Sequence, residues 1–92
     1  MNITFVKKVL ADGSPCKKCN EVIAKMEAAD QMRFINKVVV ADEADESSEG
    51  MVLAAKHEVT KAPFFIVEHD DSSVELHTIY FKFVKEVLSK LV

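Results

Sequence analysis

The chain has 92 residues, of which 49% are hydrophobic and 29% are charged. This composition is that of an ordinary globular protein, and the length allows a single domain over residues 1–92 with one hydrophobic core. No apolar stretch approaches the ~18–20 residues that a membrane-spanning helix needs. The formal net charge of −3 argues against general nucleic-acid binding, which normally uses a basic face. We therefore expect a domain that binds neither membrane nor nucleic acid.

The first residues of the chain bear on the cellular compartment in which we expect the protein. Residues 1–9 contain no basic region followed by an uninterrupted apolar segment, because Lys7 and Lys8 interrupt the run. A secretory signal needs that pattern, so we expect a cytoplasmic protein. In a reducing compartment, a close pair of cysteines is more often catalytic or metal-binding than a structural crosslink.

The first predicted elements are a strand and a helix separated by a turn. Residues 3–11 are rich in β-branched and aromatic types, which favours a strand. Residues 12–15 contain glycine and proline and predict a turn. From residue 16 to residue 30 the apolar positions recur at three- and four-residue steps, which predicts one face of a helix. Ser14 is expected to cap this helix and Pro15 to be its first residue.

A second strand and a second helix follow. Residues 34–41 include three consecutive valines at 38–40, and this run predicts a strand buried between helices. An acidic loop comes next and is expected to be solvated. Residues 48–57 predict a helix whose first turn is weakened by Gly50.

The last third of the chain predicts a hairpin and a helix. Residues 64–68 and 74–77 read as two strands, and the turn-rich residues 70–73 between them favour an antiparallel hairpin. Thr78 is expected to cap the final helix. The residues predicted for the inner face of that helix are Ile79, Phe83, Val84, Val87, Leu88 and Leu91. Four phenylalanines are predicted to serve packing: Phe64, Phe65, Phe81 and Phe83.

The strongest chemical signal is the pair Cys16 and Cys19, which has two residues between its thiols. Thiols at this spacing on the first turn of a helix can close a small disulfide ring, and the helix N-terminus favours the attacking thiolate. Lys17 and Lys18 stand between the thiols and would tune their charge electrostatically. An equally good interpretation is that both lysines are simply solvated residues at the start of a helix.

The order β-α-β-α-β-β-α, with Cys16-Lys17-Lys18-Cys19 between the first strand and the first helix, resembles the thioredoxin fold. Ala62-Pro63 at the start of the third strand strengthens the resemblance, and the compact glutaredoxin-like form is the most similar. The resemblance implies an α/β domain with a mixed four-stranded sheet flanked by helices. It also implies a thiol–disulfide oxidoreductase that transfers electrons to protein or small-molecule disulfides.

The resemblance assigns roles to four residues. Cys16 corresponds to the exposed nucleophile and Cys19 to the more buried resolving thiol. Pro63 corresponds to a proline that is cis in the family and lies opposite the disulfide. Ala62 would offer its backbone to an extended substrate segment by strand-like pairing.

Several residues depart from the glutaredoxin and thioredoxin patterns. Two lysines replace the Pro-Tyr, Pro-Phe or Gly-Pro usually found between the cysteines, and residues 12–15 lack the basic residue common in glutathione-binding relatives. Residues 76–78 read Leu-His-Thr where those relatives carry Gly-Gly followed by acidic residues. Glutathione is therefore a possible reductant but is not expected to be the preferred partner. Lys17, Lys18 and Lys61 would suit an anionic or acidic protein substrate.

The predicted partners are a disulfide-containing protein and an electron donor, either a reductase or glutathione. We expect a monomer without a bound cofactor or metal. Two other interpretations stay open: a thioredoxin-fold module that binds partners with little redox turnover, and incidental thiols. Zinc is disfavoured because a closed site needs four ligands. The three histidines are scattered along the sequence and read as surface residues: His57, His69 and His77.

Overall fold

Four strands form one mixed sheet with the order β2-β1-β3-β4 in the computed structural model, which describes residues 1–91. Their bounds are β1 Asn2–Val9, β2 Lys37–Asp42, β3 Phe64–Glu68 and β4 Val74–His77. β1 and β2 are parallel, whereas β1–β3 and β3–β4 are antiparallel. The predicted element order, the parallel first pair and the hairpin are all confirmed.

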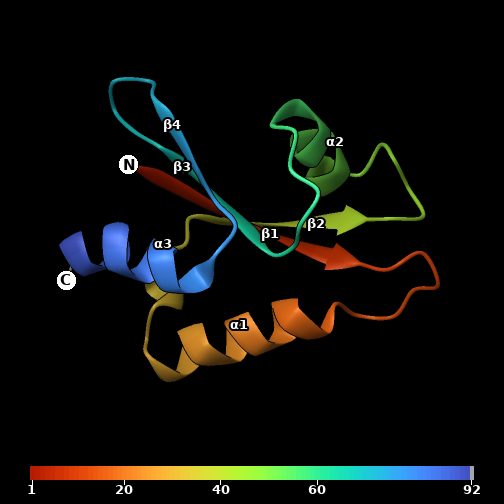
Figure 1. Cartoon of the computed structure of the whole chain (residues 1–92), viewed down its shortest axis with the longest axis horizontal. Coiled ribbons are helices and arrows are strands. Elements are labelled where there is room, and N and C mark those ends of the chain that lie inside the picture. Colours follow the sequence, from red (N-terminus) through yellow and green to blue (C-terminus); the bar gives the residue numbers. More distant parts are fainter. Residues whose placement is uncertain (92) are drawn as a thin grey trace.

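The helices lie on both faces of the sheet (Figure 1). They are α1 (Lys17–Ala28), α2 (Glu49–Lys56) and α3 (Tyr80–Glu86), with short 3-10 turns at Met32–Phe34 and Leu88–Lys90. α1 and α3 cover one face and α2 covers the other. The chain is thus a small α/β domain in which helices flank a mixed four-stranded sheet.

The alternation of β1 side chains divides the core in two, because successive residues of a strand point to opposite faces. Ile3 and Phe5 join the cluster under α1 and α3, where Phe65 and Phe83 stack with ring centroids 3.8 Å apart. Val6 joins the cluster under α2. That second cluster consists of Val6, Val39, Ala41, Phe64 and Ile66, and Met51, Leu53, Ala54 and Val59 pack against it.

Gly50 sets how closely α2 approaches the sheet. A Cβ atom at this position would lie 2.3 Å from the backbone nitrogen of Ala41 and 2.5 Å from its Cα. Since real Cβ contacts are never this short, no other residue fits without moving the helix. The glycine that weakens the helix locally is therefore what allows α2 to pack directly on β2.

The expectation that residues 34–41 form a strand buried between helices is wrong. β2 begins at Lys37 and is an edge strand, and Val38 and Val40 remain 46% and 38% exposed. Only Val39 and Ala41, on the α2 side, are buried. The valine run specifies a strand but carries no information on its place in the sheet.

The final helix also departs from expectation. It begins at Tyr80, its N-cap is Ile79 rather than Thr78, and no side chain caps it. Ile79 is 51% exposed and Phe81 is 73% exposed, so neither packs inward as predicted. Phe81 precedes the buried Phe83 by two residues, which is about 200° around a helix, so the two rings point to opposite sides. Leu91 is also exposed.

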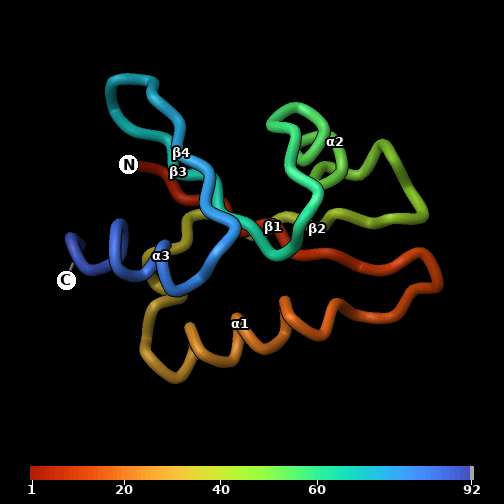
Figure 2. The backbone as a smooth tube through the Cα atoms, viewed as in Figure 1, coloured from red at the N-terminus to blue at the C-terminus, as the bar shows by residue number. Residues whose placement is uncertain are grey.

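Two loops project from the same end of the domain (Figure 2). They are residues 10–15, which follow β1, and residues 43–48, which follow β2. The Glu43 N–H donates to the Val9 carbonyl oxygen at 2.9 Å and ties the second loop to the end of β1. Within residues 1–91, no helix has the length and apolar character needed to cross a membrane.

Candidate functional site

Cys16 is the N-cap of α1, with an extended backbone (φ −75°, ψ 115°). Its Sγ accepts a hydrogen bond from the Cys19 N–H at 3.1 Å, which satisfies one of the free donors of the first turn. The prediction that Ser14 is the cap is wrong, because its N–H and hydroxyl both donate to the Asp12 carboxylate, at 2.9 and 2.6 Å. Pro15 forms an isolated antiparallel bridge with Val9, so the helix cannot begin before Cys16.

The two cysteines are free thiols with unequal exposure. Cys16 is half-buried at the start of the helix, whereas the Cys19 residue is only 1% exposed. Cys19 shares the inner face of α1 with Val22 and Met26. Its Sγ accepts a hydrogen bond from the Lys8 N–H at 3.4 Å, which links α1 to β1. Cys16 is therefore the more accessible of the two thiols.

The environment of Cys19 favours the neutral thiol. Burial raises the pKa of Cys19 to about 11, and the hydrogen bond with Cys16 acts in the same direction. The Lys8 N–H and the Lys8 charge oppose this shift but are weaker. At neutral pH the inner thiol therefore keeps its proton.

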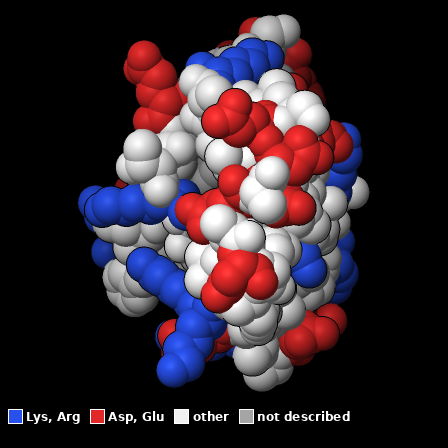
Figure 3. Space-filling view, turned by 90° about the vertical axis from the view of Figure 1, so that its right-hand side faces the viewer, with Lys and Arg blue, Asp and Glu red and all other residues white. Residues whose placement is uncertain are grey.

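Lys17 and Lys18 occupy the first two positions of α1, and both are exposed. Within residues 1–91 neither lysine forms an ion pair. Figure 3 faces the end of the domain where the loops project: acidic side chains run down its middle, with basic side chains around the rim. Both lysines are thus exposed charges next to Cys16 in the sequence, without an ion-pair partner in this part of the chain.

The Ala62–Pro63 peptide bond is cis, and Pro63 is buried. Phe64, the next residue, pairs with Val6 of β1, and Lys8 lies two residues beyond Val6. Because the Lys8 N–H reaches Cys19 Sγ, the register brings the proline segment and the dithiol to the same end of β1. Among the described residues, Ala62 takes part in no backbone hydrogen bond. Its N–H and carbonyl oxygen remain available for pairing.

Sequence reasoning missed Lys8 as a member of the site. Its backbone N–H contacts Cys19, and its side-chain Nζ lies 3.6 Å from the Glu43 carboxylate. The sequence around Lys8 gives no signal for its contact with Cys19, because that contact uses only the Lys8 backbone. Glu43 belongs to the loop that follows β2, the strand parallel to β1.

The histidines are not all surface residues. His77 is 9% exposed, and its buried Nε2 makes no hydrogen bond, so the surface assignment is wrong for this residue. Its ring packs beside Phe83 because β4 turns His77 toward α3. His69 contacts Glu75. Within residues 1–91, no group of three or more His, Cys, Asp or Glu side chains could hold a metal ion.

Comparison of the chain with protein-family models, with curated proteins and with solved structures gives no match. The fold is an α/β domain with a mixed four-stranded sheet and three helices. Because function resides in the site and not in the fold, the chemistry of the chain depends on the cysteine pair and its surroundings.

Proposed function

We propose that this chain is a glutaredoxin-like member of the thioredoxin fold that acts as a thiol–disulfide oxidoreductase through Cys16 and Cys19. One observation carries the proposal: two free thiols on one helical turn differ in exposure, and the outer one accepts the N–H of the inner one at 3.1 Å. Negative charge on Cys16 Sγ would therefore have a backbone donor and the positive end of the helix beside it.

The reaction has two steps. The Cys16 thiolate attacks one sulfur of a substrate disulfide, forms a mixed disulfide and releases the other substrate sulfur as a thiolate. Cys19 then loses its proton and attacks Cys16 Sγ, which closes the Cys16–Cys19 disulfide and releases the second substrate thiolate. The released thiolates take up protons, two electrons have passed to the substrate, and the protein dithiol is oxidised.

The unpaired backbone of Ala62 supports a place for the substrate chain beside the dithiol. An extended segment could pair with it as an added strand, a mode in which main-chain hydrogen bonds supply affinity. The cis bond to Pro63 agrees with the role that the resemblance assigns to these two residues.

The oxidised protein needs a reductant for a second turnover. A flavoenzyme reductase and glutathione are the two chemical classes, and the absence of basic residues in 12–15 disfavours glutathione as the preferred one. The chemistry fits a reducing compartment such as the cytoplasm, with the chain acting as a monomer.

A single-turnover measurement tests the proposal without knowledge of the reductant. The reduced protein is mixed with an excess of hydroxyethyl disulfide, and both the released thiol and the protein mass are followed. We expect one substrate disulfide to be reduced per protein and the protein to become lighter by two hydrogen atoms. Cys16→Ser is the control and should do neither. If the wild-type protein stays reduced, the partner-binding module becomes the better interpretation.

A further inference from the structure

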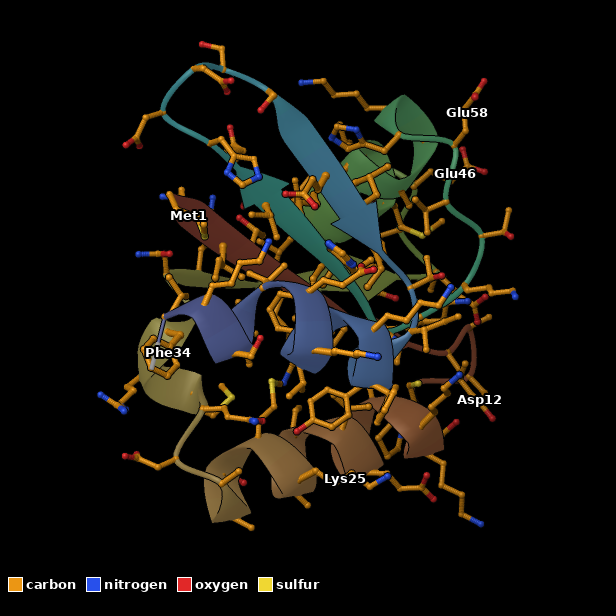
Figure 4. All side chains as sticks on the ribbon, turned by 60° about the vertical axis from the view of Figure 1, so that its left-hand side comes forward. Met1, Asp12, Lys25, Phe34, Glu46 and Glu58 are labelled. Atoms are coloured by element: carbon orange, nitrogen blue, oxygen red, sulfur yellow. The ribbon has the colours of Figure 1, made fainter. Side chains whose placement is uncertain are left out.

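A pocket of about 320 Å³ opens between α2 and the ends of β1 and β2. Its apolar wall is formed by Ala41, Met51, Ala54, Val59 and Phe64. Glu58, labelled in Figure 4, stands where α2 gives way to the segment that closes the pocket. No side chain of residues 1–91 fills this pocket, although most of its apolar wall belongs to the core cluster under α2 or packs against it.

Two residues join this pocket to the dithiol. Ala62 lines it and is also the residue whose backbone is unpaired beside Pro63. Lys8 lines it as well, while its N–H donates to Cys19 Sγ on the other side of the strand. The pocket therefore lies on the α2 face of the sheet, and the thiols lie on the α1 face. Lys8 of β1 is in contact with both.

The alternation of an extended chain determines which substrate residue would reach the pocket. If a substrate segment pairs with Ala62 as a strand, successive side chains point to opposite faces. If the cysteine of the substrate points toward Cys16, the side chain of the residue next to it in the substrate points toward the α2 face. That neighbour would enter the pocket.

The residues that line the pocket indicate which kind of substrate side chain would bind in it. The wall is apolar, and the pocket volume of about 320 Å³ is large enough for one large apolar side chain. The volume is at the lower limit for a small-molecule site, at ~300 Å³, which favours a side chain over a separate ligand. The charged residues of the lining are Lys8, Glu43 and Lys61. Lys8 is paired with Glu43, which leaves exposed Lys61 without an ion-pair partner among residues 1–91.

Building on the proposed function, we infer that the pocket selects polypeptide disulfides in which the attacked cysteine has a large apolar neighbour. An acidic residue of the same segment would lie near Lys61, since that lysine is the uncompensated charge of the lining. The substrate class is thus an extended, acidic polypeptide with an apolar residue beside its cysteine.

Two peptide disulfides test this inference. Both are symmetric dimers, one of Asp-Leu-Cys-Leu-Ser and one of Asp-Gly-Cys-Gly-Ser, and each rate is divided by the rate with hydroxyethyl disulfide. We expect the wild-type protein to prefer the leucine peptide by about tenfold, since apolar pockets discriminate on this scale. Ala55 lines the pocket from α2 and is exposed, so Ala55→Leu should occupy it and reduce the preference to below about threefold.

The control is Ala28→Leu, which makes the same change on an exposed residue at the far end of α1 and should keep the wild-type preference. Lys61→Glu supplies a second test that does not depend on filling the pocket. This substitution should lower the rate with the Asp-Leu-Cys-Leu-Ser disulfide by at least about threefold. The rate with a peptide that has Lys in place of Asp should stay the same or increase.

The outcomes separate the two proposals. Equal wild-type rates with the leucine and glycine peptides would overturn the pocket inference, as would an Ala55→Leu protein that retains the full preference. A wild-type protein inactive on hydroxyethyl disulfide would instead overturn the proposed function, and the pocket inference with it.

Discussion

The outer thiol of the pair caps the helix that carries the inner one: Cys16 Sγ accepts the Cys19 N–H at 3.1 Å. A sulfur in this position takes the place of the usual serine or aspartate oxygen at a helix N-terminus. The cap holds Cys16 half-exposed, while one turn later Cys19 points into the core and receives the Lys8 N–H. The same contact thus fixes the helix start and the unequal surroundings of the two thiols.

We predict that Cys16 reacts with alkylating reagents at least about tenfold faster than Cys19 at neutral pH. Cys16 is half-exposed, whereas Cys19 is buried and its pKa is raised to about 11, and only a thiolate is nucleophilic. Timed alkylation of the reduced protein followed by peptide mass spectrometry measures both rates. Cys16→Ser and Cys19→Ser provide the single-thiol references. Earlier labelling of Cys19 would contradict the assignment.

Cys19→Ser should trap mixed disulfides with substrates or glutathione. The variant keeps the attack by Cys16 but lacks the thiol that resolves the intermediate, so the covalent adduct should accumulate. Non-reducing gels and intact-mass spectra detect it. Cys16→Ser is the matched control and should give no adduct. Equal trapping by the two variants would show that Cys16 and Cys19 do not have the separate roles of nucleophile and resolving thiol.

Much of this arrangement could be predicted from the sequence. β3 and β4 have the predicted bounds, because each short strand is bordered by turn residues and the hairpin between them is local. The cysteine pair at the start of the first helix is equally visible, since its signal is a spacing within one turn. Such features depend only on neighbours in the chain.

The errors have both local and long-range causes. Ser14 and Thr78 have good capping chemistry, but Asp12, two residues before Ser14, accepts the hydrogen bonds of Ser14, and the last helix begins after Ile79. The valines of β2 could not reveal that the strand lies at the edge of the sheet. The pocket has no sequence signal either, since it combines β1, β2, α2 and the segment before Pro63.

Gly50→Ala should destabilise the domain by about 1–3 kcal/mol, the usual cost of an overpacked contact. The added Cβ would lie 2.3 Å from the Ala41 backbone nitrogen, which is part of a strand and cannot rotate away. This cost should exceed the gain in helix propensity, which is ~1 kcal/mol. Urea unfolding of the variant and the wild type measures the difference.

Gly13→Ala is the matched control for that substitution. Gly13 has a positive φ of +86°, but a Cβ added to it would meet nothing within 4 Å beyond its chain neighbours. Its replacement therefore tests backbone strain without a packing clash, and we expect a loss of about 1–2 kcal/mol there. A Gly50→Ala protein as stable as the wild type would mean that α2 can move away from β2 without cost.

The free energy of unfolding of the reduced protein should fall between about pH 8.5 and pH 11 because of Cys19. Its pKa is raised to about 11 in the folded protein, mainly by burial, and is ~8.5 in an unfolded chain. Between these values the unfolded state releases a proton that the folded state retains, so rising pH favours unfolding. The stabilisation is complete below the unfolded pKa and is lost as pH passes the folded one.

Urea unfolding at several pH values, under reducing conditions, measures this dependence. The Cys19 contribution should approach a slope of ~1.4 kcal/mol per pH unit where the two states differ by a full proton. Cys19→Ala removes the titrating group and should lose that part of the slope, whereas Cys16→Ser should retain most of it, because burial of Cys19 is the main cause of the raised pKa. Since all other groups are the same in the wild type and in Cys19→Ala, the difference between their curves isolates the Cys19 contribution. Parallel curves for the wild type and Cys19→Ala would mean that the inner thiol titrates alike in the folded and unfolded states.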